Sequence, residues 1–529
     1  MVNLGTMRIS ASSRRGPLMA IGLLIFVAVA AYEVSQYILE GDTTALIYIA
    51  MIFVGGVIVI AILNDWKKGV YLFLTWLLFE DFARKFLGNN MAIYFAKDFL
   101  VLIVYLAFFV AYRRKEVTTF KPPFRVPLLL MVWLGVMQIF NPASTHIVYG
   151  LLGMKLFFYY VPLMFVGYAL FNSEADLRRF FTYNSVLILI IASLGVAQAI
   201  LGHTFMNPEH PAEDIRELST LYRTAPISGI TVYRPTSVFV SDGRYANFLL
   251  VSWLLLLGFT GYLLLRHRKG RVIAFVCLAV VCGAVVLGAS RQVLLWSMAS
   301  LVVSGIAFVW GAPWKQREVV RVLRTLQRSA LGVALAMILL FFLFPDALMS
   351  RVAFYSETLL PSSSANELLF RTRDYPLQNF LGAFSYDRWP YGYGIGTTSL
   401  GTQYVARIFG AKPLGVGVES GYGALVVEQG ILGLIFWIIT TCAIVVSGWK
   451  VVNKLRGSPW FPLAFMIFWY SVLLLFPMTV NGIQPYEDFV MNAYLWLLLG
   501  ILFRLPTLAA SAQFAAVPTT PVTLSRWTR

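Results

Sequence analysis

Long runs of apolar residues, separated by polar connections, dominate the pattern along this chain. A run of about 20 apolar residues is long enough to cross the hydrocarbon core of a bilayer as an α-helix. The pattern therefore predicts an all-α polytopic membrane protein with about 14 transmembrane helices. The runs lie near residues 17–38, 44–63, 69–86, 92–112, 126–141, 153–171, 183–202, 245–265, 272–288, 292–310, 329–345, 421–447, 461–479 and 486–503.

Basic residues concentrate in alternate connections between these runs. Such connections carry Arg14 and Arg15, Lys67 and Lys68, Arg113 to Lys115, Arg178 and Arg179, Arg266 to Arg271, Lys315 to Arg328, and Lys450 to Arg456. Because cytoplasmic connections carry an excess of Lys and Arg, both termini are predicted to be cytoplasmic. The same distribution accounts for the formal charge of +17, so we expect no nucleic-acid partner. A content of 59% hydrophobic and 13% charged residues excludes an ordinary soluble protein.

Two connections on the opposite, outer side are much longer than usual. They divide the chain into N-terminal transmembrane helices at 1–202, a first outer loop at 203–243, central transmembrane helices at 244–345, a large outer loop at 346–420, C-terminal transmembrane helices at 421–505 and a disordered cytoplasmic tail at 506–529. The large loop is rich in aromatic residues, which are scarce in disordered segments, so we expect it to be ordered. Its aromatic side chains, Tyr393 among them, suit either anchoring at the lipid interface or stacking on sugar rings.

The charged residues within the apolar runs share one position, the half of the bilayer away from the basic connections. A charge at the centre of a membrane helix costs about 2.5–3.5 kcal/mol, so such residues usually have a partner or a function. They indicate a polar site that faces the outer surface, with structural ion pairs as the alternative. These residues are Glu33, Glu80, Asp81, Lys97, Asp98, Lys155, Arg244, Arg291 and Glu428.

Arginine also concentrates on the predicted outer side, where positive charge is normally scarce. Arg234, Arg291 and the pair Arg371 and Arg373 come from separate segments, and the pair precedes the glycine-rich turn PYGYGIGTTSLG at 390–401. Guanidinium groups bind phosphate oxygens in a bidentate manner, and glycines expose backbone N–H groups to a ligand. We therefore expect a diphosphate cradle here, with contacts to lipid headgroups as the alternative.

Two carboxylates near this turn are candidates for proton chemistry. Glu419 immediately precedes a predicted helix and is placed to act as a general base, although a carboxylate there could simply cap the helix. Glu428 lies deeper in the same helix, with Lys155 or Lys97 as its expected partner. The cysteines and histidines form no metal-spaced group, so we expect neither a metal nor a cofactor.

Several segments, in this order, resemble the O-antigen ligase/polymerase superfamily. They are NPASTHIVYGLLGMKLFFYYVPLMF at 141–165, YRPTSVF at 233–239, SRQ at 290–292, and the segment from Gly382 to Trp437, in which GYGIG is followed by ESGYGALVVEQGILGL. The resemblance implies a GT-C-like glycosyltransferase of the bacterial inner membrane, which needs no metal and has its two long loops in the periplasm. It matches Arg234, and Arg371 or Arg373, to arginines of that family. Where ligases carry His-Asn, this chain has Glu419 and Ser420, which favours the polymerase or exopolysaccharide branch.

The expected function is polymerisation of lipid-linked polysaccharide repeat units. Glycan would pass from undecaprenyl diphosphate to an acceptor sugar at the periplasmic face, with Glu419 as base. Arg234, Arg291, Arg371, Arg373, Lys155, Glu428 and Tyr393 would bind substrate. Membrane lipids and a chain-length regulator are the other expected partners. The alternatives are a ligase-type transfer to lipid A core or another acceptor, a transporter or flippase of lipid-linked oligosaccharide, and a different polytopic sugar transferase that uses the short acidic loop at 40–43.

Overall fold

The computed structural model describes residues 43–88, 91–208, 221–266, 269–313, 327, 338, 341–359, 370–399, 401–410, 412 and 414–514. The predicted span at 17–38 and most of the one at 329–345 lie outside the described residues. Of the predicted tail, residues 506–514 continue the last helix rather than forming a disordered segment, because the apolar pattern runs on past Pro506. The remainder of that tail is also outside the described residues.

The chain forms two compact units, residues 1–69 and 70–529. In the first unit, α2 (Thr43–Asn64) is a helix of 22 residues whose sequence carries no charged side chain. α3 (Trp66–Leu87) begins in this unit and continues into the second. Its second half carries Glu80, Asp81, Arg84 and Lys85, so a helix long enough to span a membrane is also strongly polar at one end.

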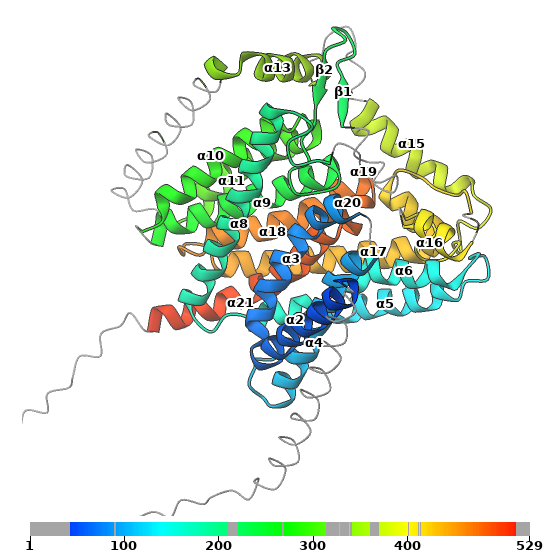
Figure 1. The fold of residues 1–529 in the computed structure, drawn as a ribbon. Helices are drawn as coiled ribbons and strands as arrows, with labels where there is room; N and C mark the ends of the chain where they lie inside the picture. The colour runs from blue at the N-terminus through cyan, green and yellow to red at the C-terminus, as the bar shows by residue number, and fades with distance from the viewer. Residues whose placement is uncertain are drawn as a thin grey trace, which may run out of the picture. The chain divides into compact units, whose positions relative to one another are not determined.

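The second unit is built almost entirely of helices (Figure 1). They are α4 (Met91–Arg113), α5 (Arg125–Ile139), α6 (Ile147–Phe158), α7 (Leu163–Ala169), α8 (Glu174–Leu201), α9 (Asp242–Arg266), α10 (Arg271–Leu287), α11 (Arg291–Gly311), α13 (Pro345–Leu359), α15 (Tyr375–Gly382), α16 (Thr402–Phe409), α17 (Gly421–Lys454), α18 (Phe461–Leu473), α19 (Thr479–Asn481), α20 (Gln484–Glu487) and α21 (Phe489–Phe514). Short π-helical turns cover Phe370–Asp374 and Leu474–Met478, and a 3₁₀ turn covers Ala383–Ser385.

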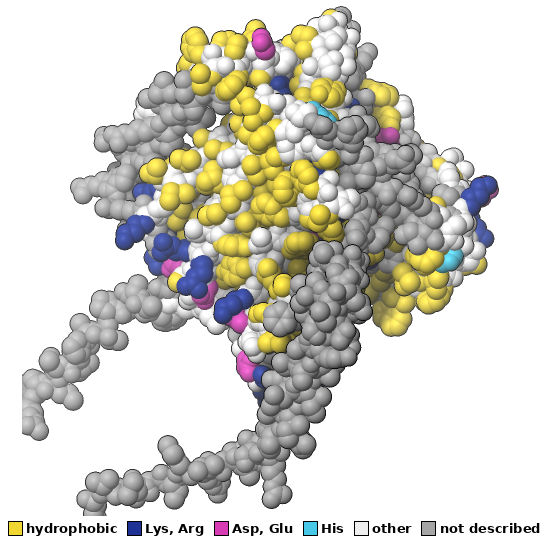
Figure 2. Space-filling model, viewed as in Figure 1, with side chains coloured by type: hydrophobic (Ala, Val, Ile, Leu, Met, Phe, Trp, Pro, Cys, Tyr) yellow, Lys and Arg dark blue, Asp and Glu magenta, His cyan; other side chains and the backbone are white. Residues whose placement is uncertain are grey.

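Eight stretches of the described helices are long and apolar enough to cross a membrane. They are Ala92–Arg113, Ile147–Ala169, Glu174–Leu201, Asp242–Arg266, Arg291–Gly311, Gly421–Lys454, Phe461–Asn481 and Phe489–Ser511. Exposed apolar side chains cover much of the face shown in Figure 2, and basic side chains gather along one edge of it. These features are those of an all-α, multi-pass membrane protein.

The first outer loop contains a small β-hairpin that the all-α expectation missed. β1 (Tyr222–Thr224) pairs antiparallel with β2 (Thr231–Tyr233), with Tyr222 opposite Tyr233. The connecting turn is held by the Glu357 carboxylate of α13, which accepts hydrogen bonds from the backbone N–H groups of Ile227 (2.8 Å) and Ser228 (3.0 Å). The strands are only three residues long and need this distant partner, so the local sequence pattern does not reveal them.

The described parts of the large outer loop are ordered, as the sequence predicts. This loop contains α13, α15 and α16 and ends at Ser420. The Ser420 hydroxyl accepts a hydrogen bond from the backbone N–H of Gly423 (3.4 Å), so Ser420 is the N-cap of α17. The start of α17 at Gly421 agrees with the predicted boundary. The cap itself corrects the expectation that Glu419 could fill this role.

Glycines bring the central helices into close contact. α9, α18 and α21 run side by side at the centre of the second unit (Figure 1), and α7 packs along α21. A Cβ atom at Gly167 would overlap the carbonyl oxygen of Leu497, and one at Gly500 would overlap that of Met164. Close approach of backbones through small residues is the usual way in which membrane helices associate, because lipid supplies little hydrophobic drive between them.

We predict that Gly167→Ala destabilises the protein, because the added methyl group must push α7 away from the backbone of α21. Overpacking of this kind costs about 1–3 kcal/mol. Thermal unfolding of the purified protein in detergent measures the change. Gly305→Ala in α11 is the matched control, since a Cβ atom there meets nothing within 4 Å. Equal melting temperatures for the two variants would contradict the close α7–α21 contact.

Candidate functional site

Eight charged residues from the helices α3, α4, α6 and α9 form a buried charge network. Its members are Glu80, Asp81, Arg84 and Lys85 of α3, Lys97 and Asp98 of α4, Lys155 of α6 and Arg244 of α9. All are buried except Lys155 and Arg244, which are partly exposed. The residues of α3 are spaced by one and four positions, so they project from the same side of the helix toward the others.

Ion pairs join the members of this network across different helices. Lys97 Nζ lies 2.8 Å from Glu80 Oε2, and Lys155 Nζ lies 2.6 Å from Asp98 Oδ2. The expectation that Lys97 or Lys155 pairs with Glu428 is therefore wrong. The partner of each lysine is set by the helix that packs against it. Lys155 of α6 meets Asp98 because α6 packs near α4.

Asp81 is shared by two arginines. Arg244 Nη1 donates to both oxygens of its carboxylate (2.9 and 2.8 Å), and Arg84 Nη1 donates to Oδ1 (2.9 Å). The Tyr94 ring makes cation–π contacts with three of the cations. Its centroid is 3.8 Å from Lys97 Nζ, 4.8 Å from Lys155 Nζ and 5.0 Å from Arg84 Cζ. Cation–π contacts of this kind are strongest where water is excluded.

The network carries more positive than negative charge. Its five cations face three carboxylates, and the nearby Asp488, which also interacts electrostatically with Arg244, reduces the excess to one. Lys85 is held by neutral acceptors, the Thr236 hydroxyl (2.8 Å) and the Ser237 carbonyl (2.6 Å). A formal excess of positive charge at the end of apolar helices favours anions.

The segment 233–240, which carries the sequence YRPTSVFV, is fastened to this network. Besides Lys85, the Gln198 side chain of α8 holds it, because Oε1 accepts from the backbone N–H groups of Thr236 (2.8 Å) and Ser237 (2.7 Å). The Val240 N–H points to Asp81 Oδ2 (3.4 Å). The backbone at Ser237 has a φ of 50°, an unusual conformation for a residue other than glycine. The chain is therefore fixed on both sides of the turn that follows Arg234.

The structure brings Arg234 and Arg291 to a common neighbour, α13. Arg234 forms an ion pair with Asp242 through Nη1, while its buried Nε has no hydrogen-bond partner among the described residues. Arg291 lies with its guanidinium carbon 6.0 Å from the Phe354 ring of α13. Burial lowers the pKa of Arg234, and the Asp242 carboxylate opposes that effect. Arg234 thus keeps one donor that no described group of the protein uses.

Arg351 is a third arginine at this place, and sequence reasoning missed it. Its Nη2 donates to the Tyr233 carbonyl (3.1 Å) and its Nε to the Leu287 carbonyl (2.8 Å). Arg84 and Lys85 lie in the last turn of α3, where a basic residue ordinarily faces solvent or headgroups, and Arg351 lies in the middle of α13, so only the packing identifies these three residues. For Arg84 and Lys85, the sequence did contain one signal. They follow Glu80 and Asp81 by four positions, a spacing that places them on the same side of a helix as these acids.

The glycine-rich turn at 390–401 packs against a break in α17. The backbone N–H groups of Tyr393 and Gly394 donate to the carbonyls of Val427 (2.8 Å) and Glu428 (2.9 Å). Two side chains from α5 and the segment after it hold the other side: Gln138 Nε2 donates to the Tyr391 carbonyl (2.8 Å), and Asn141 Nδ2 donates to that of Gly392 (3.1 Å). These N–H groups of the turn are used within the protein, so a phosphate would need other donors.

Glu428 is buried beside this turn. Its Oε1 accepts hydrogen bonds from the backbone N–H (2.9 Å) and the hydroxyl (2.7 Å) of Thr398. Tyr393, the aromatic residue expected to stack on sugar, lies edge-on to the Tyr386 ring at 6.2 Å and is partly exposed. Glu428 and Tyr393 are therefore neighbours along the same contact between the turn and α17.

The remaining predicted residues lie in the outer loop. Glu419 is exposed, and its backbone N–H points to the Asn379 side chain (3.4 Å). Arg371 belongs to the π-helical turn Phe370–Asp374, and the position of its side chain is outside the described part of the structure. Arg373 is exposed and pairs with its neighbour Asp374 (2.7 Å). No described contact joins Glu419 or Arg373 to Arg234.

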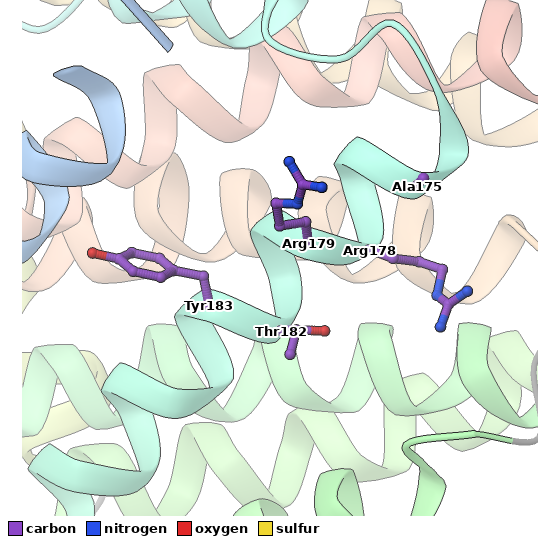
Figure 3. A pocket seen from close by; sticks show the side chains of 5 residues that line it. All are labelled: Ala175, Arg178, Arg179, Thr182 and Tyr183. Carbon is purple, nitrogen blue, oxygen red and sulfur yellow. The ribbon is translucent and has the colours of Figure 1, made fainter. Parts of the chain in front are cut away.

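A separate open hollow of about 430 Å³ lies along the first turns of α8. It is lined by Ala175, Arg178, Arg179, Thr182 and Tyr183, and Figure 3 shows the two arginines pointing to different sides of it. Most of these residues precede the predicted span at 183–202, and the sequence predicts this end of the span to be cytoplasmic. The hollow therefore contains none of the predicted site residues.

Comparison with known proteins gives no independent support for a family. No family model matches this chain, and no curated protein matches it. The resemblance of the segments at 141–165, 233–239 and 382–437 to O-antigen ligases and polymerases therefore stays a prediction from the sequence.

We predict that Lys97→Met strongly destabilises the protein, because it leaves the Glu80 carboxylate buried without a partner. Breaking a buried pair in this way costs about 3–5 kcal/mol. The double variant Glu80→Gln with Lys97→Met should recover most of that loss, since no charge then remains. Unfolding in detergent measures both. Arg373→Met, at an exposed pair, is the control and should leave stability unchanged; additive losses in the double variant would contradict the ion pair.

Proposed function

We propose that this protein is a polytopic glycosyltransferase that polymerises lipid-linked polysaccharide repeat units. It transfers glycan from an undecaprenyl-diphosphate-linked donor to an acceptor sugar, without a metal, at the periplasmic face of a bacterial inner membrane. The proposal places both termini in the cytoplasm and includes membrane lipids and a chain-length regulator as partners. It rests on the resemblance of the sequence segments together with the charges described above.

One observation carries the proposal: basic side chains from α3, α9 and α13 converge on the segment 233–240. Lys85 and Arg351 hydrogen-bond to this segment, Arg234 lies within it, and Arg244 reaches it through Asp81. A diphosphate supplies the negative charge that this arrangement favours, and its long isoprenoid tail suits a position at the end of apolar helices. Donors that are fixed before the reaction stabilise a leaving diphosphate without reorganisation.

In the proposed reaction, the Arg234 guanidinium binds the diphosphate of the donor, assisted by Arg291 and by Arg371 or Arg373. Glu419 removes the proton from the acceptor hydroxyl as that oxygen attacks the anomeric carbon. The bond to the diphosphate breaks, and the arginines stabilise the charge on the leaving group. Since Glu419 is exposed and Ser420 already caps α17, the Glu419 carboxylate is not needed to begin the helix.

Transport of a lipid-linked oligosaccharide is the second candidate, because α17 is broken at Gly430. Broken membrane helices with buried polar groups are typical of transporters. A ligase-type transfer to lipid A core is the third candidate, and the presence of Glu419 and Ser420 in place of His-Asn argues against it.

We predict that Arg234→Lys reduces polymer formation about ten- to a hundred-fold. Lysine can preserve the ion pair with Asp242, but it cannot bind two phosphate oxygens with a planar fork. Losing such a contact costs about 1.5–3 kcal/mol, which sets the expected loss of rate. Polymer length and amount, at equal protein level, measure the effect. Arg371→Lys should behave in the same way. Arg179→Lys, beside the hollow of α8, is the control; near-normal polymer from Arg234→Lys would refute the cradle.

We predict that Glu419→Gln loses about a hundred- to ten-thousand-fold in rate, as expected when a general base is removed. Binding of the lipid-linked donor should stay unchanged, because glutamine has the same shape. The melting temperature should also stay unchanged, since Ser420 caps the helix. Assays with purified enzyme separate these three quantities. Full activity in this variant would exclude Glu419 from the mechanism and leave electrostatic stabilisation by the arginines.

A further inference from the structure

Arg351 of α13 is a buried arginine whose described partners are all backbone carbonyls. It is 4% exposed. Its guanidinium donates to the carbonyls of Leu287 (2.8 Å), Ala347 (2.7 Å), Tyr233 (3.1 Å) and Ala199 (3.4 Å). No carboxylate of the described residues forms an ion pair with it. Burial of a charge is costly unless the charge is compensated, so these carbonyls have to supply the compensation.

The ends of two apolar helices supply much of this compensation. Leu287 is the last residue of α10, and Ala199 lies in the last turn of α8. Carbonyls at the C-terminal end of a helix carry partial negative charge and lack partners within the helix. One turn after Arg351, the Tyr355 hydroxyl donates to the Val286 carbonyl (3.2 Å), also at the end of α10. α13 is therefore fastened to the ends of α8 and α10.

The Tyr233 carbonyl belongs to the peptide group that leads into Arg234. Arg351 holds the carbonyl of this group, and the Leu221 carbonyl accepts a hydrogen bond from its N–H, the amide of Arg234 (2.7 Å). A peptide group is planar, so hydrogen bonds at both of its ends fix its orientation. Pro235 follows and restricts the backbone of Arg234 to extended conformations. The direction in which the Arg234 side chain leaves the backbone is thereby set before any ligand binds.

We propose that Arg351 is a positioning residue, which orients the Arg234 guanidinium for the diphosphate of the lipid-linked donor. This role rests on the proposed function, since Arg234 is the residue proposed to bind that diphosphate. Arg234 is held by Asp242 through Nη1, and its buried Nε has no partner among the described residues. A planar guanidinium binds two oxygens only when its plane faces them, and an orientation fixed in advance lowers the cost of binding. Arg351 acts through the backbone at Arg234, because its own hydrogen bonds go to carbonyls.

Binding of farnesyl diphosphate, a soluble isoprenoid diphosphate, to the purified protein in lipid nanodiscs tests this role. We expect Arg351→Lys to bind it about ten-fold more weakly, because lysine has no fork that can hold the Tyr233 carbonyl together with the helix ends. In the Arg234→Lys background, the same substitution should weaken binding by less than about two-fold, since no guanidinium is left to orient. Val352→Ala, at an exposed residue of the same helix, is the control and should bind like the wild type. Equal losses in both backgrounds would overturn the positioning role.

The same set of variants separates this role from the proposed function. Wild-type binding by Arg234→Lys would refute the diphosphate cradle, and the positioning role with it. Weak binding by Arg234→Lys together with wild-type binding by Arg351→Lys would leave the cradle in place and overturn the positioning role alone. Neither result depends on glycan transfer, because the probe carries no sugar.

A second measurement does not depend on the folding of a variant. Hydrogen exchange of the wild-type protein, followed by mass spectrometry of overlapping peptides, reports on the backbone amide of Arg234. We expect this amide to exchange slowly without ligand and no more slowly with farnesyl diphosphate, because its peptide group is already held at both ends. Rapid exchange without ligand, with protection only in the complex, would contradict an orientation that is set in advance.

Discussion

Asp81 is the residue on which the packing of α3, α9 and the segment 233–240 depends. Its carboxylate receives two arginines, one from its own helix and one from α9, and the Val240 N–H of the intervening segment. A buried carboxylate is costly unless it is fully paired, and removal of one partner is far more harmful than replacement of the whole pair. Asp81 therefore fixes α3, α9 and the segment 233–240 relative to one another.

A second constraint acts through glycine. Gly392 and Gly396 of the turn, Gly153 of α6 and Gly430 of α17 lie where a side chain would overlap a neighbouring backbone. The turn, the helix α6 and the break in α17 are consequently held together by main-chain contacts, and the turn supplies hydrogen bonds that the broken helix lacks. The glycines that first indicated a phosphate cradle have a clear structural reason, so the cationic segment 233–240 carries the functional proposal more strongly than the turn does.

The sequence predicted the features that depend on local pattern. Apolar runs located most of the long helices, and the aromatic content of the large loop indicated order. Features that depend on packing could not be predicted from the sequence. Lys155 and Lys97 were expected to pair with Glu428, but they form ion pairs with acidic residues of α4 and α3. Arg351 was missed because its acceptors are carbonyls of distant segments, and the break at Gly430 was missed because EQGILG continues the helical pattern.

Reconstitution decides most directly whether these fixed charges serve glycan transfer. The purified chain in lipid vesicles, supplied with an undecaprenyl-diphosphate-linked repeat unit, should release undecaprenyl diphosphate in an amount equal to the glycosidic bonds formed, and the lipid-linked glycan should lengthen. Movement of the intact donor across the bilayer with no new glycosidic bond would contradict the account and assign the protein to transport.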